Sequence, residues 1–116
     1  MTAATNNFII DQGANWFVTF VYKDSAGTPI NLTGYTAGLQ IRDTYADSTT
    51  DLSLTSPSGG ITITAATGTL AVTATAVQTA AIPAGNYVYD LEITSASGIV
   101  TRLVQGKISI SPQVTR

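Results

Sequence analysis

An alternating apolar segment at residues 16–23, WFVTFVYK, constrains the fold more than any other part of the sequence. Every residue in it except Lys23 is aromatic or β-branched, which is typical of a β-strand. Because both faces of such a strand are largely apolar, we predict that it lies centrally in its sheet, or that a second sheet covers one face and a neighbour partly covers the other.

A turn and a second strand follow this segment. Residues 24–27, DSAG, are turn formers with a glycine that can adopt positive φ, and Pro29 fixes the chain for the next extended segment. Residues 37–42 alternate between apolar and other side chains, which predicts a strand with one apolar face. That face consists of Ala37, Leu39 and Ile41.

Two short segments and a hairpin add further strands. Residues 8–10 are long enough only for an edge strand, and residues 51–55 predict a strand with both of their leucines, Leu52 and Leu54, on one face. Residues 61–64 and 69–73, separated by AATG, predict a hairpin whose outward side is mostly threonine.

One segment favours helix. Between Ala74 and Ile82 the alternation stops, and residues 75–81 predict one or two helical turns. A cap at Thr75 begins them, and they end before Pro83.

The last hairpin joins residues 87–94 and 100–110 through SASG. A symmetric turn pairs Ile93 with Val100, Leu91 with Arg102, Tyr89 with Val104 and Tyr87 with Gly106. This register turns Arg102 inward and Leu103 outward, so either Arg102 lies at the margin of the core or a bulge near Gly106 re-aims the strand. The expected core face comprises Tyr89, Leu91, Ile93, Val100 and Val104, packed against Leu39 and Ile41 of the facing sheet.

Strands at about ten-residue spacing predict an all-β fold. We expect an immunoglobulin-like antiparallel β-sandwich of seven or eight strands with one short helical turn, and a small closed barrel is the alternative. The 116 residues are enough for a single domain, 1–116, with a flexible arm at 1–7 and a C-terminal tail at 111–116.

Composition excludes several classes of function. The sequence has no cysteine and no histidine, which removes thiol nucleophiles, zinc-finger ligands and the usual general base, so we expect no enzyme and no cofactor. Only 10% of the residues are charged and the net charge is −2, so we expect no nucleic-acid partner. The first residues lack the basic and apolar regions of a secretory signal, and no apolar run of about 18 residues occurs, so we expect a protein made in the cytoplasm and not inserted in a membrane.

Two groups of carboxylates are candidate sites. Asp90 and Glu92 share one face of a strand, so their carboxylates lie about 7 Å apart, a spacing that a glycosidase pair can use. An ordinary solvent-exposed sheet face shows the same pattern. Asp43, Asp47 and Asp51 offer oxygen ligands for Ca²⁺ from one loop, although their spacing matches no EF-hand and acidic residues also serve turns. We assign no catalytic or metal-binding residue to either group.

Three other patterns have structural explanations. Residues 31–33, NLT, match a glycosylation acceptor, which has no role without a secretory signal. Trp16 beside Phe17 offers a platform for a sugar, but a position inside the longest strand predicts a core residue. Residues 58–60, SGG, lack the lysine and the following helix of a phosphate loop and predict a turn.

The chain resembles a family of short bacteriophage virion proteins, namely the amino-terminal module of phage baseplate upper proteins and related tail-fibre adaptors. The residues that carry the resemblance are Asp11, Gly27-Thr28-Pro29-Ile30, Leu32-Thr33-Gly34, Tyr87-Val88-Tyr89-Asp90 and Gly106. The resemblance implies a non-enzymatic structural protein of the tail, baseplate or fibre attachment, located in the virion. It also implies contacts with other virion proteins and with copies of itself, and no small-molecule substrate.

Two alternatives stay open. The hydroxyl-rich surface, with twenty threonines in the sequence, equally fits a capsid decoration or cement protein. A carbohydrate-binding module, or a small glycosidase using Asp90, Glu92 and an aromatic platform, would need an open groove lined by Trp16, Tyr35 or Tyr45 with a carboxylate. Flat threonine or apolar faces with free strand edges would instead favour assembly.

Sheet edges are the expected place of assembly. A soluble monomer normally protects its edge strands with charge, and residues 8–10, 61–64 and 69–73 carry none. We therefore expect at least one of these strands to meet another chain, with Thr62 and Thr73 pointing outward.

Overall fold

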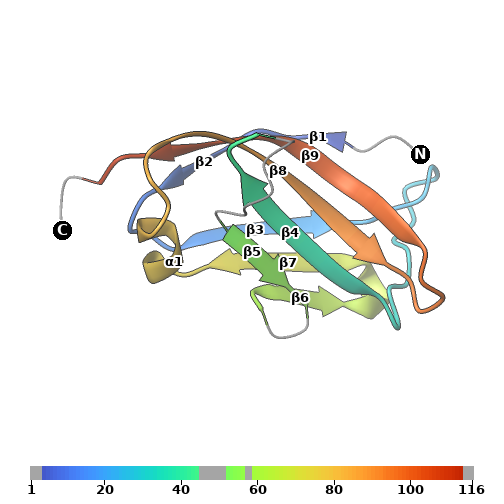
Figure 1. Cartoon of the computed structure of the whole chain (residues 1–116). Coiled ribbons are helices and arrows are strands. Elements are labelled where there is room, and N and C mark those ends of the chain that lie inside the picture. Colours follow the sequence, from blue (N-terminus) through green and yellow to red (C-terminus); the bar gives the residue numbers. More distant parts are fainter. Residues whose placement is uncertain (1–3, 45–51, 57–58, 114–116) are drawn as a thin grey trace.

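The computed structural model describes residues 4–44, 52–56 and 59–113, which form two β-sheets packed face to face (Figure 1). The larger sheet contains β1 (Ala4–Thr5), β2 (Phe8–Asp11), β9 (Val100–Ser111), β8 (Gly85–Thr94), β4 (Thr36–Arg42) and β5 (Leu52–Thr55). The smaller sheet has the order β3 (Trp16–Val21), β7 (Thr69–Ala74) and β6 (Ile61–Thr64). The predicted all-β, immunoglobulin-like sandwich is confirmed, with eight strands of four residues or more in the described part of the chain and the two-residue β1 in addition.

The short helix α1 (Ala76–Ala80) lies at one end of the sandwich, and its predicted cap is confirmed. The Thr75 side chain accepts a hydrogen bond from the backbone N–H of Gln78, whose own side chain accepts one from the Thr75 N–H. Thr79 is fully buried, and its hydroxyl donates to the Ala14 carbonyl at 2.8 Å. The helix is thereby fixed to the turn between β2 and β3.

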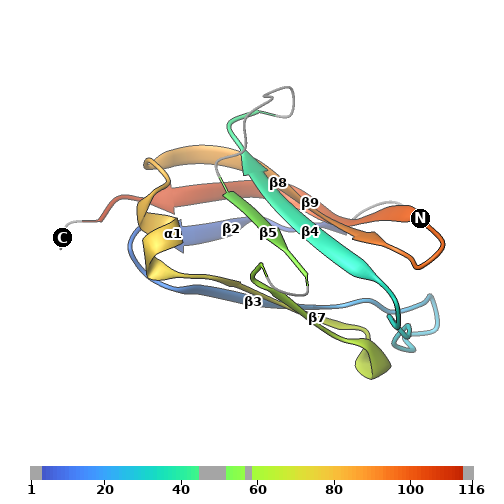
Figure 2. The same cartoon turned by 60° about the horizontal axis from the view of Figure 1, so that its bottom comes forward.

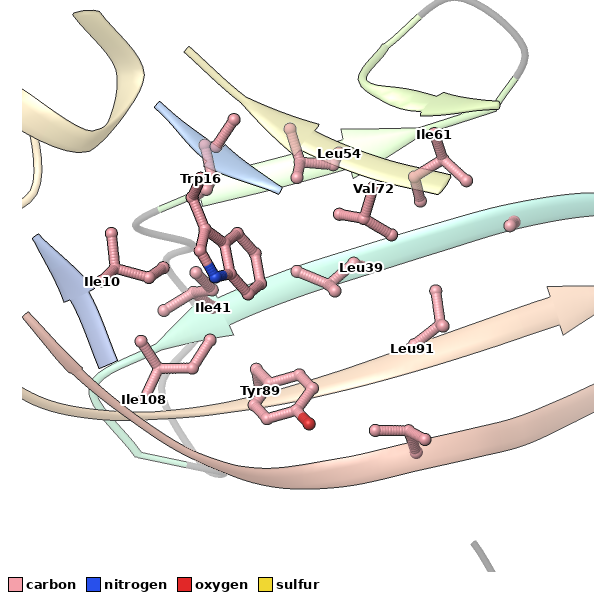
Figure 3. Packing of buried hydrophobic residues seen from close by; sticks show 14 of the residues in the cluster. Ile10, Trp16, Leu39, Ile41, Leu54, Ile61, Val72, Tyr89, Leu91 and Ile108 are labelled. Carbon is pink, nitrogen blue, oxygen red and sulfur yellow. The ribbon is translucent and has the colours of Figure 1, made fainter. Parts of the chain in front are cut away.

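The core fills the space between the two sheets (Figure 3). The inner side chains of the smaller sheet, such as Trp16 and Val72, point toward those of the larger sheet, such as Ile41 and Tyr89. Phe8 packs edge-on against the Trp16 ring, with ring centroids 5.6 Å apart. The predicted apolar faces of β4 and β5 are confirmed, because Leu39, Ile41, Leu52 and Leu54 are all buried.

The last hairpin forms, but its predicted register is wrong. Near the turn Glu92 pairs with Arg102, and after a bulge Leu91 pairs with Val104. Leu103 is the extra residue, so the bulge lies there and not near Gly106. The first pairs are already shifted by one residue, since Thr94 and not Ile93 pairs with Val100, and this shift turns Arg102 outward beside Glu92. The bulge at Leu103 shifts the later pairs by one more residue, so that Val104 faces the core opposite Leu91.

Two further expectations about the core face are wrong. Val100 is 58% exposed, because it lies next to the turn where β8 and β9 leave the sandwich. Leu39 and Ile41 belong to the same sheet as Leu91, since β4 pairs directly with β8. The facing sheet contributes Trp16 and the inner residues of β6 and β7 instead.

The described part of the expected N-terminal arm lies along β9. β1 pairs in parallel with β9, and Gly106 lies directly under the Asn6 carbonyl, where a Cβ atom would clash. The Tyr89 hydroxyl donates to the same Asn6 carbonyl at 2.8 Å. This contact ties the arm to the core.

Tyr89 makes folding sensitive to high pH. Burial raises the pKa of its phenol above the usual range, so the folded state favours the neutral form. The stability that the neutral phenol contributes is fully present below about pH 10, the pKa of a tyrosine in the unfolded chain. It is lost as the pH rises toward the higher pKa that Tyr89 has in the folded protein.

We therefore expect Tyr89→Phe to be less stable than the wild type by about 1 kcal/mol at pH 7, because it loses the hydrogen bond to Asn6. Above pH 10 the difference should shrink by up to about 1.4 kcal/mol per pH unit and then reverse. Urea unfolding of both proteins between pH 7 and 11 checks this, and a difference that stays constant with pH would contradict it.

Candidate interaction surface

The outer face of the smaller sheet carries no charged side chain. Cross-strand pairing aligns Phe17 with Thr73, Thr19 with Ala71, and Val21 with Thr69, while the alternate residues point into the core. β6 continues these rows, since Thr62 pairs with Ala71 and Thr64 with Thr69. We name this surface the uncharged face, and it consists of Phe17, Thr19, Val21, Thr62, Thr64, Thr69, Ala71 and Thr73.

Phe17 is the most unusual member of the uncharged face. Its side chain is 69% exposed, whereas its neighbour Trp16 is buried. Val21, on the same side of β3, is 46% exposed. Large apolar side chains exposed on a surface without charges are typical of a binding site for another macromolecule.

The described charges lie on the larger sheet and in turns. They are Asp11, Lys23, Asp24, Arg42, Asp43, Asp90, Glu92, Arg102 and Lys107. The two sheets therefore differ in chemistry: the outer face of the larger sheet is polar and charged, and that of the smaller one is apolar and hydroxyl-bearing.

β3 is an edge strand, so the first of its two predicted arrangements, a central position in the sheet, is wrong. It pairs only with β7 among the described strands, and it runs along the margin of the smaller sheet (Figure 2). The two apolar faces of this segment led to the wrong prediction, because burial by a second strand is the usual reason for such a pattern. One face indeed packs on the core, but the other has no cover within the described chain.

The three strands that were considered as places for another chain to bind, β2, β6 and β7, differ in the neighbours that cover their edges. β7 is covered on both sides by its own chain, because it lies between β3 and β6, so the expectation is wrong for it. β2 pairs in parallel with β9. β6 pairs only with β7 and keeps one free edge in the described structure, and Thr62 is exposed there as predicted.

Asp90 and Glu92 lie on the outer face of the larger sheet, in an open depression of about 470 Å³. Arg102 Nε is 3.3 Å from an Asp90 carboxylate oxygen and 4.0 Å from one of Glu92. A single guanidinium thus pairs with both carboxylates, and this ion-paired, partly exposed arrangement is that of a solvated sheet face.

The other candidate sites lie in turns or outside the described residues. Asp43 is exposed at the end of β4, while Asp47 and Asp51 fall outside the described residues. In the part of the chain that the structure describes, no three acidic, cysteine or histidine residues gather as metal ligands. Asn31 accepts a hydrogen bond from the Thr33 N–H at 2.9 Å, which makes the NLT sequence a turn.

The glycine-rich segment and the aromatic residues also have structural roles. Gly60 has a φ of 107°, and its carbonyl accepts from the Thr73 N–H at 2.8 Å, so the described end of the SGG segment joins β5 to the smaller sheet. Trp16 is a core residue, as predicted, which removes it as a sugar platform. The depression beside Tyr35 has no acidic residue among its described lining side chains, and Tyr45 lies outside the described residues.

No helix among the described residues is long and apolar enough to span a membrane.

Sequence reasoning missed Phe17 as a surface residue, although a signal was present. The segment WFVTFV is apolar at both odd and even positions, and only one set can face the core of a two-layer sandwich. The excess apolar set therefore needs a second partner, either a neighbouring element of the same chain or another molecule. The sequence alone does not distinguish between these two.

The fold is similar to that of proteins of known structure. The sequence matches no protein-family model and no curated protein. The chain is similar to CopC from Methylosinus trichosporium OB3b, at 14% identity over 99% of this chain and 90% of that chain, with a TM-score of 0.49. It is also similar to the soluble domain of PmoD from Methylocystis sp. ATCC 49242 (Rockwell), at 16% identity over 89% of this chain and 77% of that chain, with a TM-score of 0.49.

These matches contradict the expected resemblance to phage baseplate upper proteins and tail-fibre adaptors, because neither is a phage protein. The expected role as a virion structural protein and the virion localisation are therefore wrong, and the capsid decoration and carbohydrate-binding alternatives are withdrawn with them. The residues that carried the resemblance have local structural explanations: Gly27 adopts a φ of 84° in a turn, and Gly106 makes room for Asn6. At these identities and TM-scores, neither solved structure brings a ligand or an activity to this chain.

Proposed function

We propose that the chain is a non-catalytic protein-interaction domain that binds other protein chains through the uncharged face and the adjoining free edge of β3. The observation that carries this proposal is the 69% exposure of Phe17 on a sheet face without a charged residue. Burying an exposed aromatic side chain of this size contributes about 1.5–3 kcal/mol to binding, and the neighbouring threonines lose water at a lower cost than charged residues would.

The absence of turnover is part of the proposal. Asp90 and Glu92 are paired with Arg102, and the sequence has no histidine or cysteine to act as a base or nucleophile. The proposed contact uses apolar and hydroxyl groups, so its affinity should depend only weakly on salt concentration.

Site-specific photo-crosslinking in the cells that naturally make the chain tests this function. Val21 and Val100 form a matched pair, since both are exposed valines, at 46% and 58%, but they lie on different sheets. A photo-reactive residue at position 21 should give covalent adducts with protein, and one at position 100 should give none.

The substitution Phe17→Lys should abolish the adducts formed at position 21, because it places a charge within the contact. Mass spectrometry of the adducts then identifies the bound chain, whether a second copy or a different protein. Equal adduct yields at positions 21 and 100, or no adduct at position 21, would contradict the proposed function.

A further inference from the structure

The backbone of β3 has a defined set of hydrogen-bonding groups at its free edge. The Tyr22 N–H donates to the Gly68 carbonyl at 2.8 Å, and this pair continues the register in which Val18 lies opposite Val72. In an antiparallel ladder, successive residues point their N–H and C=O groups alternately to the two sides. The even-numbered residues of β3 therefore bond to β7, and Phe17, Thr19 and Val21 direct their backbone groups away from the sheet.

From this geometry we infer that two copies of the chain pair through β3, antiparallel, about a two-fold axis at Thr19. The inference rests on the proposed function, for which it names a second copy as the partner. The pairing would join the two smaller sheets into one continuous sheet with the order β6-β7-β3-β3-β7-β6.

The axis at Thr19 satisfies the hydrogen-bonding pattern of both copies. Thr19 then faces Thr19 of the second copy, and Phe17 faces Val21 of the second copy, so the residues with free backbone groups lie opposite each other. Each such pair exchanges two hydrogen bonds, which gives up to about six for the interface. An axis shifted by one residue would place Thr19 opposite Phe17 and would leave one free residue without a partner.

Side chains and charges also fit this register. Phe17 beside Val21 is an aromatic and β-branched cross-strand pair, a combination that stabilises antiparallel sheets. Just beyond the strand, Lys23 would face Asn15 and Asp24 would face Ala14 of the second copy, so no like charges meet. The described β3 edge also lacks the charges, prolines and bulges that normally protect an edge strand from pairing with another chain.

The size of the contact sets its strength. Strands of six residues bury less than the roughly 1,200 Å² of a standard protein interface, so the dimer should dissociate on dilution. Sedimentation velocity of the purified chain over a range of concentrations should therefore show a reversible monomer–dimer equilibrium that changes little with salt.

A charge-swap experiment tests the two-fold axis. Thr19→Lys and Thr19→Glu each place like charges opposite each other across the axis, so each variant alone should dimerise at least about tenfold more weakly than the wild type. An equimolar mixture of the two should recover a dimer, since the introduced ammonium and carboxylate groups face each other only in the mixed species. Ser53→Lys is the matched control, because Ser53 is an exposed hydroxyl residue on the edge strand β5 of the other sheet, and it should dimerise like the wild type.

A second readout uses the absence of cysteine from the sequence. Under mild oxidation, Thr19→Cys alone should form a disulfide-linked dimer, whereas Phe17→Cys should do so efficiently only when mixed with Val21→Cys. Circular dichroism of each variant checks that it folds.

A wild-type chain that stays monomeric at all soluble concentrations, or a dimer that Thr19→Lys leaves intact, would overturn the inference. The proposed function fails separately, when position 21 gives no protein adducts in cells. A monomeric chain whose position 21 crosslinks to a different protein would therefore refute the dimer and keep the interaction domain.

Discussion

Replacing Trp16 with alanine should lower the free energy of unfolding by about 3–5 kcal/mol, the range for truncating a large buried aromatic residue. Trp16 points into the space between the sheets, is 8% exposed, and packs against Phe8. Its removal leaves a cavity at the place where β2 and the smaller sheet meet, and the two sheets are held too rigidly by their own pairing to close it. Urea denaturation followed by circular dichroism measures the loss.

Phe17→Ala is the matched control for this prediction. The two aromatic residues are adjacent in the sequence but lie on opposite faces of β3, and Phe17 makes no contribution to the core. Its truncation should cost less than about 1 kcal/mol of stability. If Phe17→Ala destabilises the fold as strongly as Trp16→Ala, the assignment of inner and outer faces is wrong.

Replacing Leu91 with alanine should lower the free energy of unfolding by about 2–5 kcal/mol. Leu91 is fully buried in the middle of the larger sheet, where it pairs with Leu39 on one side and with Val104 on the other. These neighbours belong to long paired strands, which restricts their collapse into the cavity. The same urea titration measures the effect.

Leu103→Ala provides the comparison for Leu91→Ala, because it removes the same atoms from the bulge residue of β9, which is only partly buried. We expect it to cost clearly less than Leu91→Ala. A loss below about 1 kcal/mol for Leu91→Ala would show that this face is not the core.

Much of the fold could be predicted because apolar side chains recur at every second residue of a sandwich strand and so indicate which of its faces is buried. The apolar residues of β4 and β5 indicated their buried faces, and Thr75 with Pro83 indicated the position of α1. The hairpin register failed because the turn pairs Thr94, and not Ile93, with Val100, and because the bulge residue Leu103 shifts all later pairs by one more. The two shifts leave little trace in the pattern of side chains, since the inward Arg102 and the outward Leu103 of the symmetric register were their only signs.

The candidate site was harder to predict because the position of a strand in its sheet depends on contacts with distant parts of the chain. The residues of β3 indicate that both of its faces are apolar. They do not indicate that β2 pairs with β9, which leaves β3 at an edge. The threonine-rich outer side of β6 and β7 was visible in the sequence. Its connection with Phe17 and Val21 into one uncharged face required the register of the smaller sheet.

The central claim is that a second chain binds at the free edge of β3, and amide hydrogen exchange followed by NMR tests it most directly. The backbone N–H groups of Phe17, Thr19 and Val21 should exchange rapidly in dilute protein and become protected when the protein is concentrated or when its partner is added. Those of Val18 and Phe20, which face β7, should be protected under all conditions and serve as internal controls. Rapid exchange at the three edge residues under every condition, or protection already present in the dilute monomer, would contradict the claim.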